Sequence, residues 1–462
     1  MSITGAYMVP HPPVIMAEVG RGEEKKIQKT IDAFTEVGRR IGNLRPDTII
    51  VTSPHAHMYS NYFQISSGKN VHGDMKQFRA RTVQFDKDYD TELVTHISEL
   101  AYAKQFPAGK LGQQGDDLDH GTMVPLYFIE KFHKDYKLVR IGISGQPLED
   151  HYRLGMLIKQ ASEDLCRNVV FIGSGDLSHK FSTESPYGFV TEGPEYDKLI
   201  MDVMGSGNFG KLFAFDSTFC EKAAECGHRS FIIMAGALDR TNIKAEILSH
   251  EGPFGIGYGV CAYEIRSDAP ERNFLDQRLD AETARLKKQR STEDEYVQLA
   301  RKSVEAYVTS SRHISIPNDI PDEMTSTSAG AFVSIHEGGR LRGCIGTVSA
   351  AQDCIAEEII SNAISAATKD TRFDPISPGE LSAIEITVDI LGEAEVIKGQ
   401  ESLDPGRYGV IVTKGGRRGL LLPNLDGIDT AEKQIAVAKR KAGIGEDEPG
   451  VKLERFEVVR HY

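Results

Sequence analysis

The sequence has few of the features that stabilise small secreted proteins or membrane proteins. It has six cysteines in 462 residues, and no two of them form a Cys-x-x-Cys pair. This spacing excludes a disulfide framework and a compact cysteine-rich zinc site. No apolar run reaches the roughly 20 residues that a membrane-spanning helix needs. Residues 1–6 lack a charged stretch followed by an apolar one, so we expect no signal peptide and a cytoplasmic location.

Basic charge is also scarce. The chain has 54 Lys and Arg residues against 67 Asp and Glu residues, which gives a formal net charge of −13. Nucleic acids and anionic membranes attract basic surfaces, so we expect a general binder of neither. The length of 462 residues exceeds that of one ordinary core, and 40% of the residues are hydrophobic. We therefore expect two or three packed domains.

The first part of the chain, residues 1–265, alternates short apolar runs with amphipathic patterns. The apolar runs lie at 48–53, 138–143 and 169–173, and helical patterns lie at 23–44 and 152–166. Strands that alternate with helices predict an α/β domain with a mixed sheet flanked by helices. Ligands of such domains bind where loops leave the strand ends.

A polar segment divides this part from the rest of the chain. Residues 266–290 break the apolar pattern and end in a charged helical stretch at 280–290, which predicts a linker. Residues 291–462 contain strand patterns at 330–335, 384–390, 408–412 and 419–423, with helical patterns at 351–368 and 429–442. They predict an α+β domain. Its first helix would be capped by Ser291 or Thr292.

Histidines beside predicted strands are the main candidates for chemistry. His11 lies in Val9-Pro10-His11-Pro12-Pro13, where the prolines stiffen the chain. His55 follows a predicted strand and Pro54, and we favour it over His57, which lies two residues further on. Neutral imidazole suits a catalytic transition metal. The pattern predicts a metal site that is dispersed over a fold.

Two further histidines each follow a carboxylate. His120 directly follows Asp119, and His179 follows Asp176 by three residues. A neighbouring carboxylate can orient an imidazole and raise its basicity, so each histidine is a candidate acid–base or substrate-binding group. The alternative is a capped helix start, because Asp176 or Ser178 could serve as caps.

An adjacent carboxylate and thiol, Glu225 and Cys226, precede the apolar run 231–238, which predicts a buried helix. Polar residues at the mouth of such a helix are unusual, since unpaired charge is costly to bury. Glu225 could be a carboxylate ligand and Cys226 a thiolate ligand. Alternatively, Glu225 caps the helix and Cys226 packs in the core.

These motifs resemble the class III extradiol dioxygenase superfamily of the LigB type, and more closely its Memo branch. The resemblance rests on the motifs around His11, His55, His120 and Cys226, and on the run Gly173–His179. In the LigB type, two histidines and a glutamate hold a non-haem ferrous ion. His11, His55 and Glu225 match those places. In the Memo branch a cysteine takes the third place, and Cys226 matches it.

The same resemblance implies roles for the other motifs. His179 would act as a general base on a small phenolic or enolic substrate, with Asp176 beside it, and His120 would orient an oxygenated substrate. His57 and His228 are left without a role. A thiolate in the third ligand place would soften the ion and weigh against oxygenase chemistry.

The second domain resembles the AMMECR family. The match rests on the runs Leu341–Thr347, Ala367–Phe373 and Leu421–Pro423. Glycines on both sides of Cys344 would allow a close backbone approach, and Arg342 could favour its thiolate. A tight turn with a packed cysteine is the alternative.

The fusion of both domains in one chain resembles the AmmeMemoRadiSam system, which implies a separate radical S-adenosylmethionine enzyme as partner. The chain itself lacks the Cys-x3-Cys-x2-Cys motif that binds the cluster of such enzymes. We therefore expect a metal-dependent enzyme or enzyme subunit with iron, or another divalent transition metal, in an anaerobic setting. A non-catalytic metal-binding scaffold and a true aerobic ring-cleaving dioxygenase are the alternatives. Self-association into a homo-oligomer is left open.

Overall fold

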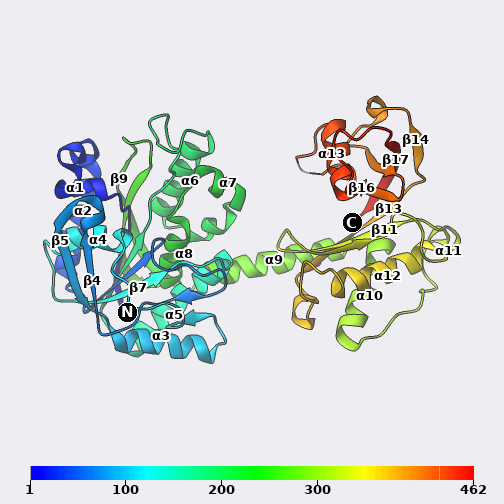
Figure 1. Cartoon of the computed structure of the whole chain (residues 1–462). Coiled ribbons are helices and arrows are strands. Elements are labelled where there is room, and N and C mark those ends of the chain that lie inside the picture. The colour runs from blue at the N-terminus through cyan, green and yellow to red at the C-terminus, as the bar shows by residue number, and fades with distance from the viewer. Residues whose placement is uncertain (1, 426) are drawn as a thin grey trace. The chain divides into compact units, whose positions relative to one another are not determined.

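The computed structural model describes residues 2–425 and 427–462, and the chain divides into two compact units, Met1–Leu279 and Asp280–Tyr462 (Figure 1). The first unit is an α/β domain, and the second combines one large sheet with helices. The predicted fold class is therefore confirmed. No helix of the described residues is long and apolar enough to cross a membrane.

A six-stranded mixed sheet forms the centre of the first unit, in the order β7-β2-β8-β1-β10-β9. Its strands are β1 (Ile3–Val9), β2 (Thr48–Ser53), β7 (Lys137–Gly142), β8 (Val169–Ser174), β9 (Thr241–Glu251) and β10 (Tyr258–Asp268). β7, β2, β8 and β1 run parallel, and β10 and β9 continue the sheet in antiparallel pairs. The carboxyl ends of β1, β2 and β8 therefore meet at one edge of the sheet.

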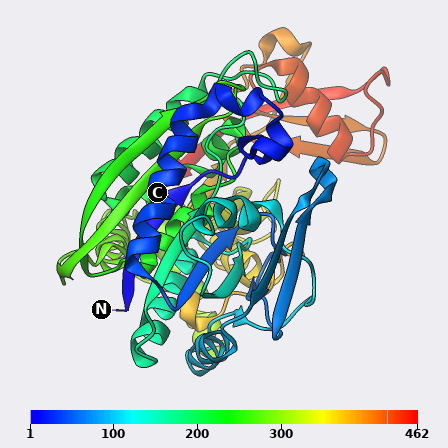
Figure 2. The same cartoon turned by 90° about the vertical axis from the view of Figure 1, so that its left-hand side faces the viewer.

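Helices bury both faces of this sheet, which explains why its central strands are mostly apolar. All residues of β2 and β8 are buried. Ile49 and Val51 of β2 pack on one face with α2 (Gln28–Leu44) and α4 (His120–Ile129). Ile50 packs on the other face, which is covered by α3 (Thr91–Ala103), α5 (Leu148–Asp164), α6 (Glu192–Ser206) and α8 (His228–Ala237). α2 also lies against β9 and β10 (Figure 2).

Short elements complete the first unit. They are η1 (Pro13–Ile15), α1 (Ala17–Gly20), η2 (Glu23–Ile27), β3 (Phe63–Gln64), β4 (Asn70–Met75), η3 (Lys76–Phe78), β5 (Ala80–Asp88), β6 (Ala108–Gly109), η4 (Phe209–Ala214) and α7 (Ser217–Ala223). β4 and β5 form an antiparallel hairpin, and β3 pairs with β6. The helical pattern expected at 23–44 is thus a 3-10 turn followed by α2.

The second unit contains a sheet in the order β12-β11-β13-β17-β15-β16, with β14 paired to β17. Its strands are β11 (Ala331–Glu337), β12 (Arg340–Gly346), β13 (Ile384–Leu391), β14 (Glu395–Ile397), β15 (Tyr408–Lys414), β16 (Arg417–Leu421) and β17 (Lys452–His461). Helices α10 (Glu295–Ser310) and α12 (Ile355–Thr368) pack with β11 and β13, and α13 (Ala431–Lys441) packs with β15 and β16. The short helices are α11 (Asp322–Ser326), η5 (Pro378–Glu380) and η6 (Gln400–Ser402).

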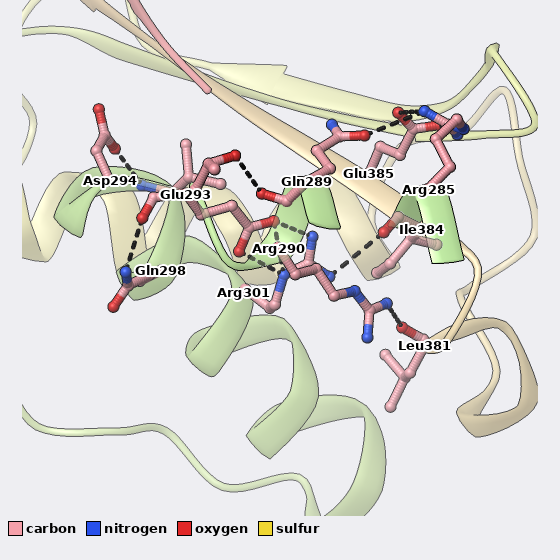
Figure 3. Close-up of polar contacts among 12 residues, drawn as sticks. Arg285, Gln289, Arg290, Glu293, Asp294, Gln298, Arg301, Leu381, Ile384 and Glu385 are labelled. Atoms are coloured by element: carbon pink, nitrogen blue, oxygen red, sulfur yellow. Dashed lines mark hydrogen bonds and ion pairs between the residues drawn. The ribbon is translucent and has the colours of Figure 1, made fainter. Parts of the chain in front are cut away.

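The segment predicted as a linker, residues 266–290, contains the end of β10 and helix α9 (Phe274–Arg290). The last turns of α9 are held within the second unit (Figure 3). The Arg285 guanidinium pairs with the Glu385 carboxylate of β13 at 2.7 Å, and Arg290 donates to the Leu381 carbonyl at 2.6 Å. These contacts give two basic side chains of α9 partners within the second unit.

The cap of α10 differs from the prediction. Asp294 is the N-cap, and its carboxylate accepts hydrogen bonds from the backbone N–H groups of the first helical turn at 3.1 Å. Ser291 and Thr292 donate their hydroxyls to the carbonyls of Lys288 and Gln289 at the end of α9. The prediction of Ser291 or Thr292 was wrong because a hydroxyl can serve either helix end, and the end of α9 lies directly before them.

Candidate metal centre

Three loops leave the carboxyl edge of the sheet in the first unit and converge. β8 lies between β2 and β1 in this sheet. His11, His55 and Asp176 each lie two residues beyond the last residue of β1, β2 and β8, respectively. The same offset on three neighbouring parallel strands places these residues over one region of the sheet edge.

His11, His55 and Cys226 form a group whose side-chain ligand atoms all lie within 4.8 Å of one another. The Nε2 atoms of the two histidines are 3.0 Å apart, and Cys226 Sγ lies 3.6 Å from His11 Nε2. Metal bonds of about 2.0–2.1 Å to nitrogen and 2.3 Å to sulfur at tetrahedral angles separate ligand atoms by roughly 3.3–3.6 Å. The two separations that involve His11 Nε2 are therefore close to those of ligands on one metal ion.

The tautomer of His11 follows from its hydrogen-bond partners. Pro125 lies inside α4 and has no N–H to bond the Gly121 carbonyl one turn earlier. That carbonyl accepts the Ser174 hydroxyl instead, at 2.6 Å. Because the Ser174 proton is used there, its oxygen accepts the bond of 3.0 Å from His11 Nδ1–H. His11 Nε2 then carries a lone pair, which faces His55 and Cys226.

Burial supports the neutral state of these imidazoles. His11 is 1% exposed, and this burial is the main reason that its pKa lies well below the usual range. The neighbouring His55 lowers the pKa further. Burial also lowers the pKa of His55, which stands at the solvent side of the group. Neutral imidazole is the form that binds metals.

Two glycines bring Cys226 to this position. A Cβ on Gly175 would lie 2.0 Å from the Gly227 Cα, so the loop after β8 and the turn before α8 touch through bare backbone. The Gly227 N–H donates to the Asp176 carbonyl at 3.1 Å, and the Asp176 N–H donates to Cys226 Sγ at 3.3 Å. Burial and the carboxylates of Asp176 and Glu225 raise the pKa of the thiol well above its usual range. A cation at the group would reverse this preference.

Asp176 serves the backbone of His11 rather than His179. Its carboxylate accepts the His11 N–H at 2.8 Å, whereas His179 Nε2 lies 4.0 Å from it, beyond hydrogen-bond distance. Burial raises the pKa of Asp176 to about 7. The carboxylate–imidazole pair expected from the sequence is therefore not hydrogen-bonded. Asp176 instead links the two candidate ligand loops.

The Asp119 carboxylate likewise accepts a hydrogen bond from a backbone N–H group and not from the adjacent imidazole of His120. Its carboxylate accepts the Thr122 N–H at 3.0 Å as the N-cap of α4, and it accepts the Ser53 hydroxyl at 2.5 Å. The capped helix start that was the alternative reading is observed here. Through Ser53, the cap also ties the start of α4 to the loop that carries His55.

His120 and His179 lie around the three-residue group. The His120 ring centroid is 4.1 Å from that of His55 and 5.4 Å from that of His11. The His179 ring stacks on Tyr187 at 5.4 Å. Burial and the neighbouring His55 lower the pKa of both His120 and His179 to about 4. Both imidazoles are therefore neutral at pH 7 and able to accept a proton.

Glu225 lies outside the group formed by His11, His55 and Cys226. Its carboxylate accepts the backbone N–H of His228 at 2.6 Å, at the start of α8. Burial raises its pKa to about 7. Of the two adjacent candidates for the third ligand, the geometry therefore favours the thiol of Cys226 and gives the carboxylate a capping role.

The two histidines that were left without a role have other partners. His57 pairs with Asp116. His228 is buried, with Nε2 3.1 Å from the Leu212 carbonyl and Nδ1 3.3 Å from the Tyr196 hydroxyl. Neither lies in the group of three donor atoms.

Residues that the sequence did not single out also shape this site. Ser174 and Pro125 control the His11 tautomer, and Tyr187 supports His179. Ser174 lies within the Gly173–His179 run and could have been noticed there. The contribution of Pro125 depends on the contact between α4 and β8, which the sequence does not display.

In the second unit, Cys344 lies in strand β12 rather than in a turn. Its thiol accepts the Ser334 hydroxyl at 3.3 Å, and its N–H donates to Asp370 at 2.9 Å. The Arg342 guanidinium pairs with Glu380 at 2.7 Å. Glu380 therefore competes with the Cys344 thiol for the charge of Arg342, which opposes the expected activation of that thiol.

Comparisons with known proteins also divide the chain into two domains. The family described as the catalytic LigB subunit of aromatic ring-opening dioxygenase matches residues 5–261, and the AMMECR1 family matches residues 297–461. A protein of Clostridium acetobutylicum is 42% identical over 469 residues, which covers 100% of this chain and 99% of that protein. A protein of Thermotoga maritima is 48% identical over 170 residues, covering 37% of this chain and 98% of that protein.

Solved structures resemble parts of the chain. An uncharacterized protein from Pyrococcus horikoshii is 30% identical, with a TM-score of 0.34, and the match covers 36% of this chain and 88% of that one. An uncharacterized protein from Escherichia coli K12 is 15% identical, with a TM-score of 0.38, and the match covers 56% of this chain and 99% of that one.

Proposed function

Because the chain belongs to the LigB family and carries an AMMECR1 domain, we propose that its first unit is a metal-dependent enzyme or enzyme subunit. The observation that carries the proposal is the approach of His11 Nε2, His55 Nε2 and Cys226 Sγ within 4.8 Å of one another. We propose these three residues as ligands of a mononuclear ion, Fe2+ or another divalent transition metal. Two imidazoles and a thiolate also suit zinc, and metal analysis distinguishes these ions.

The proposed substrate is a small molecule with a phenolic or enolic hydroxyl group. A bound divalent ion would supply Lewis acidity, which lowers the pKa of a hydroxyl group beside it. His179 is neutral at pH 7, so its imidazole can accept the proton of that hydroxyl. His120 can donate a hydrogen bond to a substrate oxygen. The Tyr187 ring stacks on the His179 ring and is 60% exposed, so it can also contact a planar substrate.

A cysteine ligand favours an anaerobic setting over oxygenase chemistry. Thiolates are oxidised more readily than imidazoles or carboxylates. The joined LigB and AMMECR1 domains support a place in the AmmeMemoRadiSam system, with a separate radical S-adenosylmethionine enzyme as partner. The cytoplasm is the proposed location. An aerobic ring-cleaving dioxygenase and a metal-binding scaffold for the radical enzyme are the competing functions.

Metal analysis of anaerobically purified protein tests the metal site. We expect about one equivalent of a transition metal in the wild type and in His57→Ala, and loss of metal in His11→Ala and Cys226→Ala. Retention of metal by the His11→Ala variant would contradict the ligand assignment.

Substrate panels of phenols, catechols and enols then separate the functions. Turnover without oxygen that is lost in His179→Ala, with metal retained, supports the enzyme. Ring cleavage in air supports the dioxygenase. Turnover only by the radical enzyme, unchanged by His179→Ala, supports the scaffold.

A further inference from the structure

A groove in the second unit gathers positive charge. Its volume is about 760 Å³, and its wall includes the cationic side chains of Arg290, Lys302 and Arg312 and one carboxylate, Glu305. These side chains leave a formal excess of two positive charges. The site is separate from the metal centre, because all of its residues belong to the second unit.

Arg290 has hydrogen-bonding capacity that protein atoms do not use. One of its terminal nitrogens donates to the Leu381 carbonyl (Figure 3). Its Nε atom is buried and has no hydrogen-bond partner among the described residues. Burial and the neighbouring Arg301 lower the pKa of Arg290. The second terminal nitrogen of the guanidinium forms no hydrogen bond among the described residues, so the group can still donate to a ligand oxygen.

Lys302 and Arg312 are exposed, and neither forms an ion pair in the part of the chain that the structure describes. Glu305 lies one helical turn from Lys302 but does not pair with it. The nearby Glu293 is occupied, because it forms a buried ion pair with Arg301 (Figure 3). Glu305, the carboxylate of the wall, acts on Arg290 through its charge without forming an ion pair with it, so the wall keeps its excess of two positive charges.

The rest of the wall suits an organic group. Ala306, Ile314, Leu381 and Pro378 contribute apolar surface, and Ser315 and Ser382 contribute hydroxyls. Small-molecule sites commonly have volumes of about 300–1,000 Å³, and this groove lies within that range. A free inorganic anion would leave most of the groove empty.

We propose that this groove binds a phosphate monoester of a small organic molecule. A phosphate monoester carries up to two negative charges at neutral pH, which matches the excess positive charge of the wall. The guanidinium groups of Arg290 and Arg312 can bind phosphate oxygens through paired N–H groups, and Lys302 adds a point charge. The organic part lies against the apolar wall.

Calorimetric titration of the 462-residue chain tests the proposal with four probes: inorganic phosphate, ribose 5-phosphate, adenosine 5′-monophosphate and adenosine. We expect inorganic phosphate to bind weakly, at least one of the two esters to bind more tightly, and adenosine not to bind. Absence of ester binding, or equal affinity for adenosine and its monophosphate, would overturn the proposal.

Variants locate the binding. Lys302→Gln and Arg312→Gln should each weaken ester binding by about tenfold, because each removes one charge-assisted contact. Both side chains are exposed and without ion pairs, so the variants should keep the thermal stability of the wild type. Lys441→Gln on α13 removes an equally exposed lysine elsewhere in the unit and should change nothing. Wild-type affinity in the Lys302→Gln/Arg312→Gln double variant would place any binding elsewhere and overturn the assignment.

Discussion

Replacement of Ser174 by alanine should weaken metal binding although it removes no ligand. Ser174 is fully buried, and its hydroxyl joins the Gly121 carbonyl to His11 Nδ1–H. Without it, the buried Nδ1–H has no acceptor, which costs about 1–3 kcal/mol. The ring can avoid this cost by carrying its proton on Nε2, but that proton blocks the lone pair that would bind the metal.

Either outcome disfavours the metal-bound state. Loss of the residue that orients a ligating histidine typically lowers metal affinity by about 10–100-fold, which corresponds to roughly 1.4–2.7 kcal/mol. We therefore expect the metal dissociation constant of Ser174→Ala to rise within this range. The assay is an anaerobic competition titration with a chromophoric chelator.

Ser230→Ala is the matched control. Ser230 is also fully buried, at the start of α8, but its hydroxyl has no hydrogen-bond partner among the described residues. The two variants lose the same atom from the same kind of environment. A Ser174→Ala protein that is folded and binds metal as tightly as Ser230→Ala would refute the tautomer argument.

Three further predictions follow from the same structure. Pro125→Ala adds an N–H that competes for the Gly121 carbonyl, so thermal stability should rise while metal affinity falls less than in Ser174→Ala; higher metal affinity would contradict this. Cys226→Ala should lower metal affinity more than about a hundredfold, whereas Glu225→Gln, which can still cap α8, should not; mass spectrometry of bound metal compares them, and equal losses would favour Glu225 as a ligand. Burial lowers the pKa of His151 from 6.5 to about 3, so as pH falls the unfolded chain takes up this proton first. This residue alone then lowers the unfolding free energy by about 1.4 kcal/mol per pH unit between about pH 6 and 4. His151→Gln should reduce the slope of unfolding free energy between pH 6 and 4, and an unchanged slope would exclude His151 as its source.

Much of the fold could be predicted because local patterns and global packing agree. The runs at 48–53 and 169–173 carry apolar side chains on both faces, which predicts strands that are covered on both sides. They form β2 and β8, whose residues are all buried. Strand β12 was missed because its sequence, with Gly343 and Gly346, has the composition of a turn. Its register against β11 and the close approach of Gly343 to the Ala366 carbonyl make it a strand.

At the candidate site, too, some features could be predicted from the local sequence and others could not. Histidines directly after apolar strands could be recognised as candidates, because the end of a parallel strand is a local feature with a known position in the fold. The roles of Asp119 and Asp176 could not, since a carboxylate beside a histidine in sequence can bond either the ring or the nearest backbone N–H. In both cases the backbone N–H is the partner.

The sequence alone determined the α/β class of the first unit and the positions of His11 and His55 after its strands, because hydrophobic periodicity and strand ends are local properties. Only the tertiary structure placed the side chain of Cys226, and not that of Glu225, beside His11 and His55. The two residues are adjacent and their side chains diverge, so the choice depends on which one the contact between Gly175 and Gly227 turns toward the strand ends. It also decided which nitrogen of His11 is free, because that depends on a proline, a carbonyl and a hydroxyl from two other elements meeting at one ring.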